Sequence, residues 1–91
     1  MLVVKLLGKS TTVNAGSGSS VPNIDGLGAQ YVMVQHSHSS DRLVEVRTGA
    51  GVTTGSMHIA GKDPIIVQKD RTDLIYSSAS DVYATSVVYQ G

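Results

Sequence analysis

The sequence predicts an all-β protein: a small antiparallel β-sandwich or barrel of about 7–8 short strands, in a single domain spanning residues 1–91. Residue usage is the first reason, because Val, Ile and Thr are abundant whereas Glu45 is the only glutamate. β-branched side chains suit a pleated surface better than a helix. The second reason is spacing. Short apolar runs separated by turn residues recur about every 8–12 residues, as in sandwiches and barrels.

The apolar runs define the expected strands in chain order. They lie at Leu2–Leu7, Tyr31–Gln35, Leu43–Arg47, Val52–Ala60, Ile65–Lys69, Leu74–Tyr76 and Val82–Tyr89. Turn residues separate the later strands at Thr48–Gly51, Gly61–Pro64, Asp70–Asp73 and Ser77–Asp81. Connections of this kind favour hairpins, so we expect mainly antiparallel pairing.

Side-chain alternation predicts which face of a strand is buried. The strand Leu43–Arg47 is the clearest case, because its two valines share one face while Glu45 and Arg47 share the other. By the same rule, Met57 lies on one face of its strand and His58 on the other.

The last predicted strand, Val82–Tyr89, has no clearly solvated face. One face carries Tyr83, Thr85, Val87 and Tyr89, and the other carries Val82, Ala84, Ser86 and Val88. Two interpretations remain open. Either the strand is central and buried on both faces, or a partner covers the tyrosine-bearing face, since Tyr is common at interfaces.

A long Gly/Ser-rich loop near residues 14–29 interrupts the regular spacing of strands. Loops of this length are uncommon inside small domains and are usually functional or disordered. One interpretation is a flexible connection. The other is an arm that becomes ordered against a neighbouring subunit, with Val21, Ile24 and Leu27 as apolar anchors.

Charge and composition narrow the classes of partner. Seven basic side chains balance seven acidic ones, which argues against a nucleic-acid or anionic-membrane surface. No apolar run approaches the ~20 residues that a membrane span needs, and the first residues do not have the pattern of a secretion signal. A chain this short builds a thin core and has no Cys for a disulfide, so we expect a homo-oligomer or another protein partner.

The best metal-site candidate is His36-Ser37-His38, because residues two apart on a strand face the same side, and His58 could add a third ligand. The alternative is a polar, solvent-facing turn, which we favour because no acidic or histidine cluster of ligand spacing supports the pair. We therefore assign no metal ligand.

Other candidate motifs are weaker. The segment Gly49–Gly55 resembles a dinucleotide-binding loop only superficially, because no helix follows it. No nucleophile elbow is present, and the aspartates at the predicted turns are typical turn residues rather than a calcium loop. We assign no catalytic residue and no cofactor, and we expect no enzyme activity.

The stretch from about Gly28 to the C-terminus resembles the small virion structural proteins of tailed bacteriophages, especially phages of cyanobacteria. The residues that carry this resemblance are YVMVQHSHSSDRLVEVRTG, GSMHIAGKDPIIVQKD and RTDLIYSSASDVYATSVVYQG. The resemblance implies a β-sandwich or barrel used as an outer building block of the particle. Members of the family occupy head, neck and tail positions, and none of their residues is catalytic.

The expected function is therefore a capsid decoration (cement) protein on the outer surface of a phage particle, with the major capsid protein or other virion proteins as partners. The alternatives are a neck, tail or fibre-associated virion protein, or a lectin-like module that binds a receptor or glycan. A nucleic-acid-binding barrel is disfavoured because the Lys and Arg side chains are scattered and the only aromatic residues are tyrosines.

Overall fold

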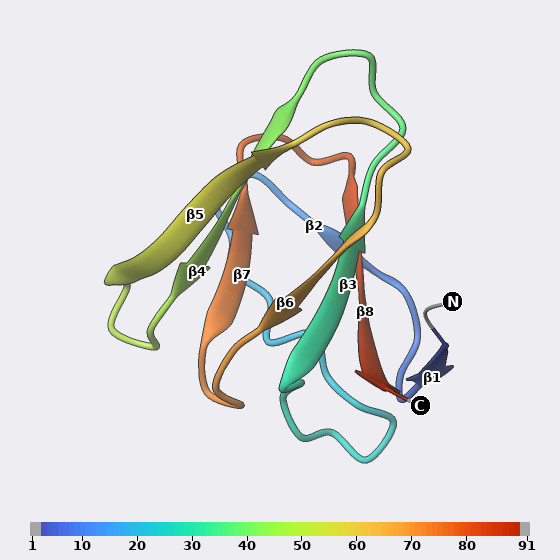
Figure 1. Ribbon diagram of the computed structural model, residues 1–91. Helices are drawn as coiled ribbons and strands as arrows, with labels where there is room; N and C mark the ends of the chain where they lie inside the picture. The colour runs from blue at the N-terminus through green and yellow to red at the C-terminus, as the bar shows by residue number, and fades with distance from the viewer. Residues whose placement is uncertain (1–2, 90–91) are drawn as a thin grey trace.

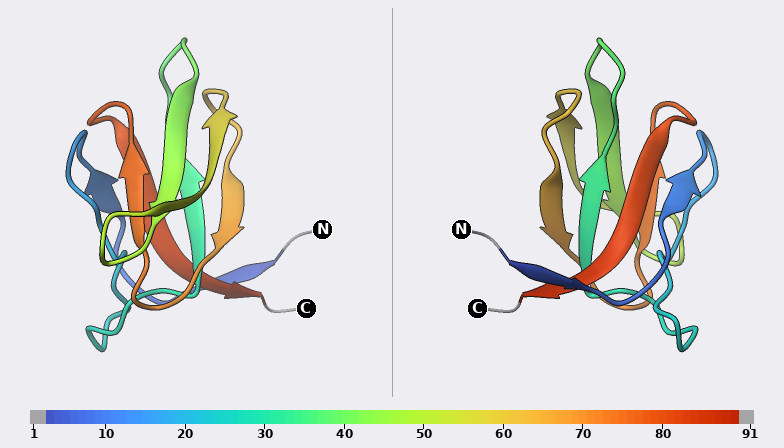
Figure 2. Two further views of the ribbon diagram at one scale, coloured as in Figure 1. Left: turned by 90° about the vertical axis from the view of Figure 1, so that its left-hand side faces the viewer. Right: turned by 90° about the vertical axis from the view of Figure 1, so that its right-hand side faces the viewer.

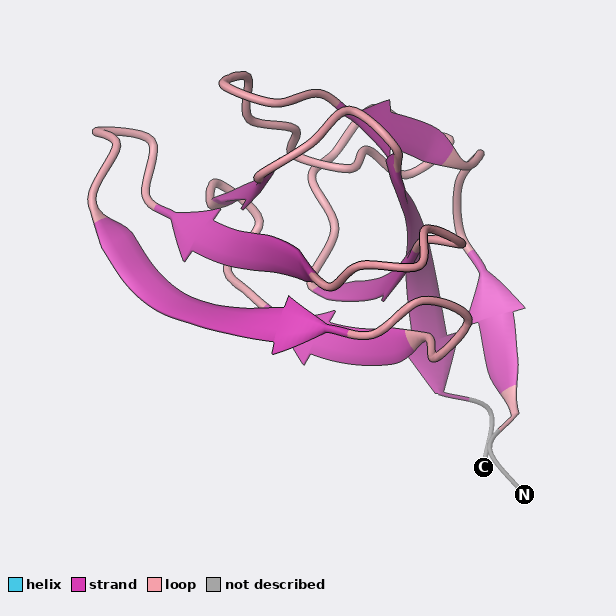
Figure 3. Ribbon diagram, turned by 90° about the horizontal axis from the view of Figure 1, so that it is seen from above, coloured by secondary structure: helices cyan, strands magenta, loops and turns pink. Residues whose placement is uncertain are grey.

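Two β-sheets pack face to face in the computed structural model, which describes residues 3–89 (Figure 1). Within those residues there are eight strands and no helix, and hence no helix long and apolar enough to cross a membrane (Figure 3). The strands are β1 (Val4–Leu6), β2 (Thr11–Val13), β3 (Tyr31–Gln35), β4 (Arg42–Arg47), β5 (Thr53–Ile59), β6 (Ile65–Gln68), β7 (Leu74–Ser77) and β8 (Val82–Tyr89). The predicted all-β fold is confirmed, and of the two predicted architectures it is the sandwich.

The larger sheet has the strand order β1-β8-β3-β6, with β2 also paired to β8, and the smaller sheet has the order β5-β4-β7. Every strand pair is antiparallel, as expected. The expected series of hairpins is wrong, however, because only β4 and β5 are both consecutive and paired. At β3–β4, β5–β6, β6–β7 and β7–β8 the chain crosses between the sheets instead (Figure 2).

The strand bounds agree with the sequence pattern except near the N-terminus. Strands β3 and β8 have the predicted bounds, and the other predicted strands shift by one to a few residues at their ends. Leu2 of the first predicted strand lies outside the described residues. Strand β2 was not predicted, because Thr11 and Thr12 carry no alternating apolar pattern and the strand exists only through its pairing with β8.

Strand β8 is the central strand of the larger sheet. It pairs with β3 on one side and with β2 and then β1 on the other. Its first half is buried on one face only, where Val82, Ala84 and Ser86 lie in the interior. On the opposite face Tyr83 stays 43% exposed whereas Val87 is buried, so the central position is confirmed and burial on both faces holds only toward the end of the strand.

The core between the sheets is built from small aliphatic side chains. Its buried members are Val13, Val21, Ala29, Val32, Val34, Val44, Ile59, Ile75, Val82 and Ala84. The partly buried Val46, Ile65 and Val67 pack against its margin. This set contains no large aromatic side chain, so the core has a limited volume. The segments that cover the core therefore determine which of its sides stay exposed to solvent.

The Gly/Ser-rich segment closes one side of the sandwich. Ser19 exchanges two backbone hydrogen bonds with Ile75 of β7, at 3.0 and 2.8 Å, so the loop covers the free edge of that strand. The buried hydroxyl of Ser77 donates a hydrogen bond of 3.2 Å to the carbonyl oxygen of Val13, which joins β7 to β2. The segment is therefore tied to its own domain rather than being a free connection.

Val21 fixes the same segment from inside. Its side chain is completely buried, and its φ of 50° is a left-handed conformation that β-branched residues rarely adopt. Burial of the valine holds a backbone geometry that is locally unfavourable. Of the three expected anchors of an intersubunit arm, Val21 thus anchors the loop to its own core, whereas Ile24 and Leu27 remain exposed.

The two faces of the smaller sheet differ as the alternation predicted. The outward face of β4 carries Glu45 and Arg47, whose side chains form an ion pair of 2.9 Å, and Arg47 stacks 4.2 Å from the ring centre of Tyr76. Thr53 also donates a hydrogen bond of 3.0 Å to Glu45. The ion pair and this hydroxyl lower the pKa of Glu45.

Arg42 and Asp81 link the two sheets at one end of the sandwich. Arg42 lies on the same face of β4 as the buried Val44, and Asp81 directly precedes β8. The guanidinium donates two hydrogen bonds of 2.9 Å to the carboxylate, one to each oxygen. This bidentate pairing is the main cause that lowers the pKa of Asp81.

We predict that Val21→Ala lowers the free energy of unfolding by about 1–3 kcal/mol, because it removes buried methyl groups and leaves a cavity. Ile24→Ala, in the same loop but with a side chain 81% exposed, should change it by less than about 0.5 kcal/mol. Urea unfolding followed by circular dichroism measures both. Equal effects of the two substitutions would contradict the assignment of Val21 to the core.

We also predict a pH dependence from the Arg42–Asp81 pair. Because the folded-state pKa of Asp81 lies below the ordinary value of about 3.9, the pair stabilises the fold above that pH and this stability is lost as the pH falls through the folded-state value. Asp81→Asn should therefore lose less stability than the wild type between about pH 5 and pH 2. Thermal unfolding across that range tests this, and parallel curves for the two proteins would refute it.

Candidate functional site

The histidines considered as metal ligands do not come together. His36 is buried, which corrects the expectation that it faces water in a polar turn. Its Nε2 donates to the carbonyl oxygen of Ile59 at 2.8 Å, and its Nδ1 accepts from the backbone N–H of His38 at 3.2 Å. Both ring nitrogens are thus already bonded to backbone. His38 and His58 are exposed, and His58 lies opposite Leu43 on the outward face of β5.

The remaining sequence motifs form connections. Residues 49–51 lie in the turn between β4 and β5, where Gly51 has a φ of 88°, and Gly55 lies within β5. Of the predicted-turn aspartates, Asp73 accepts a hydrogen bond of 3.4 Å from the backbone N–H of Asp70, as in a side-chain-supported turn. Within residues 3–89, no group of three or more His, Asp or Glu side chains is placed to hold a metal ion.

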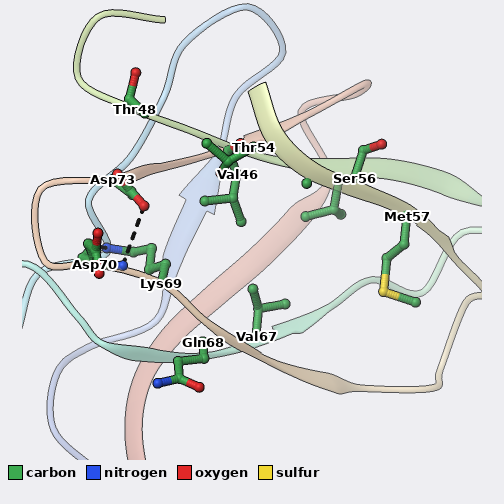
Figure 4. Close-up of a pocket in the computed structure, with 12 residues that line it drawn as sticks. Val46, Thr48, Thr54, Ser56, Met57, Val67, Gln68, Lys69, Asp70 and Asp73 are labelled. Carbon is green, nitrogen blue, oxygen red and sulfur yellow. Dashed lines mark hydrogen bonds between the residues drawn. The ribbon is translucent and has the colours of Figure 1, made fainter. Parts of the chain in front are cut away.

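A groove of about 600 Å3 lies on the side of the sandwich opposite to β2. It lies where β5 and β6, the edge strands of the two sheets, border the same opening (Figure 4). Val44, Val46 and Val67 supply apolar surface from the margin of the core, and Met57 borders the groove from β5. The groove is therefore the place where the core is left uncovered.

Gly55 explains why the groove is hollow. The register places Gly55 opposite Val46 and Met57 opposite Val44, so both residues belong to the inward face of β5. A Cβ atom built on Gly55 would meet nothing within 4 Å. Glycine weakens a strand interior and often marks a place where another backbone or a ligand approaches closely. No internal packing requires it here.

Strand β5 also presents an unprotected edge. Its residues 53–58 are all exposed, and no described strand pairs with its free side. The strand contains no Lys, Arg, Asp, Glu or Pro, the residues that usually prevent edge-to-edge pairing. A β-bulge lies only at its start, at Thr54, and Gly55–Ile59 pair regularly with β4. A free, uncharged edge beside an apolar groove is suited to receiving an extended peptide backbone.

The other sheet edges carry such protection. Strand β7 is covered by Ser19, and β1 and β2 are only three residues long, with the exposed Lys5 in β1. Strand β6 has four residues and follows Pro64. Short length, charge and proline all discourage pairing with another chain. Among the described strands, this contrast distinguishes β5.

One end of the groove is polar. Lys69 is buried, and its ammonium donates hydrogen bonds to the carbonyl oxygens of Ala29 at 2.8 Å and Asp70 at 3.1 Å. Burial lowers the pKa of Lys69, while the carboxylates of Asp73 and Asp70 act in the opposite direction (Figure 4). The backbone bonds made by Lys69 tie the end of β6 to the start of β3, so this lysine closes the groove rather than offering a free charge.

A second candidate surface is the tip of the long loop, residues 22–28, which projects at the bottom of Figure 1. Ile24 and Leu27 are 81% and 55% exposed there. The tip is nevertheless held firmly, because Pro22 and Gly28 form a β-bridge and the N–H of Asn23 donates to the carbonyl oxygen of Leu27 at 2.7 Å.

Further bonds attach this tip to the body of the protein. The buried Ser86 hydroxyl donates to the side-chain oxygen of Asn23, and the N–H of Ile24 donates to the carbonyl oxygen of Leu7 at 2.8 Å. A Cβ on Gly28 would overlap the backbone oxygen of Arg71, so the loop crosses that turn in close contact. The tip is thus an apolar projection held in one position.

Neither surface follows directly from the sequence pattern. Of the three apolar loop residues named from the sequence, Ile24 and Leu27 are exposed and Val21 is buried. The edge position of β5 depends on the order of strands, which local alternation does not reveal. Comparisons with protein-family models, characterised proteins and solved structures give no significant match. The functional interpretation therefore rests on the two surfaces themselves.

We predict that Gly55→Val raises the free energy of unfolding of the isolated subunit by about 0.5–1 kcal/mol, because the new side chain enters open space and favours extended backbone. Gly28→Val is the matched control and should cost about 1–3 kcal/mol, since its side chain overlaps the backbone. Urea unfolding at low protein concentration measures both. A destabilising effect of Gly55→Val would show that the space is filled.

Proposed function

We propose that the chain is a structural component of a bacteriophage particle, a capsid decoration (cement) protein that sits on the outer capsid surface and bridges capsid subunits. The observation that carries the proposal is the fixed apolar tip at residues 22–28, which presents Ile24 and Leu27 to solvent. The resemblance of the chain from Gly28 onward to virion structural proteins supplies the choice of particle.

An ordered tip lowers the entropic cost of binding. A flexible arm loses conformational entropy when it docks, whereas a segment already fixed by backbone and side-chain hydrogen bonds loses little. Burying the two exposed side chains at a capsid contact then contributes roughly 25 cal/mol per Å2 of apolar area. Such a single contact is weak, but a decoration protein repeats it over a symmetric lattice and gains by avidity.

The architecture supports a mechanical role in the same way. The loop that presents the tip also places Val21 in the core and covers the edge of β7. Force applied at the tip would therefore act on the whole sandwich rather than on a loose connection. The partners in this proposal are the major capsid protein at the tip and, for a homo-oligomer, further copies of the chain.

The decisive variant is the double substitution Ile24→Ser with Leu27→Ser. It should reduce binding to undecorated capsids of the phage that contains the protein by about tenfold or more, because each lost apolar contact weakens binding by about 1 kcal/mol or more. Val52→Ser is the control, since Val52 is exposed but lies outside the tip. Co-sedimentation with capsids measures the binding. Equal binding of the double variant and wild type would exclude the tip as the contact.

The copy number of the protein in purified particles separates the alternatives. A decoration protein should be present in proportion to the major capsid protein by quantitative mass spectrometry. A copy number per particle that matches a neck, tail or fibre ring would instead support one of those positions. Absence from the particle, together with specific retention on a glycan array, would support the lectin-like module instead.

A further inference from the structure

We propose that β5 pairs antiparallel with β5 of a second copy of this chain, around a two-fold axis at Ser56, so that Met57 of each copy covers Gly55 of the other. Self-pairing through β5 depends only on the groove and its edge strand, and not on the identity of the particle. The proposal adds to the proposed function the surface through which copies associate and the register in which they do so.

The first step is that the partner supplies a strand. The free edge of β5 leaves backbone N–H and C=O groups on one side without a strand partner among the described residues. A two-stranded contact across such an edge satisfies these groups through regular ladder bonds. The neighbouring groove supplies apolar walls from Val46 and Val67 for side chains that face inward (Figure 4).

The second step is the register. A two-fold axis perpendicular to the sheet keeps the inward faces of both copies on the same side, so inward residues oppose inward residues. If the axis passes at Ser56, Gly55 lies opposite Met57 of the second copy, and Met57 lies opposite Gly55. The long side chain of Met57, 49% exposed in the single chain, then lies beside the position that has no side chain. Flexible, unbranched Met suits such an irregular space.

Neighbouring registers lack this fit. An axis at Gly55 places two glycines opposite each other and leaves the hollow empty. An axis at Met57 places two methionines opposite each other and aligns Gly55 with Ile59. Only the register centred on Ser56 matches the largest exposed inward side chain of the strand with its empty position, and the match occurs twice because of the symmetry.

The third step is that the partner is a second copy. Residues 53–59 contain no Lys, Arg, Asp or Glu, so two identical edges meet without like-charge repulsion. In the register at Ser56, the outward pair at the axis is Ser56 with Ser56, and Thr54 of the β-bulge lies opposite His58, so only small or polar side chains meet there. The strand is thus complementary to itself without any substitution, and the same contact forms a closed pair rather than an open filament.

Cysteine cross-linking tests the register, because the chain contains no Cys of its own. Directly opposed residues in an antiparallel pair have Cα atoms about 4.5 or 5.5 Å apart, within the range for a disulfide. Ser56→Cys should therefore form a covalent dimer in a glutathione redox buffer. Thr53→Cys is the matched control on the same strand. The two Thr53 positions are six residues out of register, which separates them by about 20 Å.

We expect the Ser56→Cys dimer to form at least about tenfold faster than the Thr53→Cys dimer, since paired cysteines react at an effective concentration in the millimolar range. Sedimentation of the wild type should show a concentration-dependent dimer. Ser56→Lys, which places two ammonium groups at the axis, should shift it to monomer while circular dichroism stays unchanged. Equal cross-linking rates, or a wild type that stays monomeric at millimolar concentration, would overturn the proposal.

The outcomes are distinguishable from those for the proposed function. If Ser56→Cys forms the dimer and the Ile24/Leu27 double variant still binds capsids, the β5 contact is supported and the tip is excluded as the capsid contact. Capsid binding that depends on the tip, with no Ser56→Cys dimer, retains the decoration role and rejects self-pairing. If the wild type is monomeric in sedimentation and Ser56→Lys abolishes capsid binding, β5 pairs with the capsid protein and not with itself.

Discussion

The limited volume of the core is the constraint on which the structure depends. Ten buried residues, all Val, Ile or Ala, must hold two sheets together without a disulfide and without a large aromatic side chain. Such a core supports closure on one side only. There, the loop at residues 14–29 inserts Val21, Ser19 pairs with β7, and the Ser77 hydroxyl reaches Val13. On the other side Val44, Val46 and Val67 line an open groove.

The long loop relates the closed side to the exposed tip. A buried valine in a left-handed conformation, a Ser86–Asn23 hydrogen bond and a close crossing at Gly28 fix the loop along its length. The same bonds that seal the core therefore hold Ile24 and Leu27 in the open. An apolar tip that cannot fold back onto its own core is available to another surface, which is why order in this loop favours a binding role over a simple connection.

Much of the fold could be predicted from local pattern, and the exceptions have a common cause. Alternation gave the bounds of β3 and β8 and the two faces of β4, because each is encoded within a few residues. It did not give β2, whose Thr11 and Thr12 form a strand only by pairing with β8, nor the crossings that replace the expected hairpins. The burial of His36 was missed for the same reason, since its partner Ile59 lies 23 residues away.

The sequence by itself determined that this chain is an all-β sandwich or barrel with a long loop between two early strands, and it identified Val21, Ile24 and Leu27 as apolar residues of that loop. Period-two alternation and turn residues act over short distances along the chain, so they can be recognised from the sequence alone. Only the tertiary structure decided which strand is an edge, that Val21 faces inward, and that Gly55 faces an empty groove. Those properties depend on which distant segments lie side by side, and strand order is set by packing of the whole core.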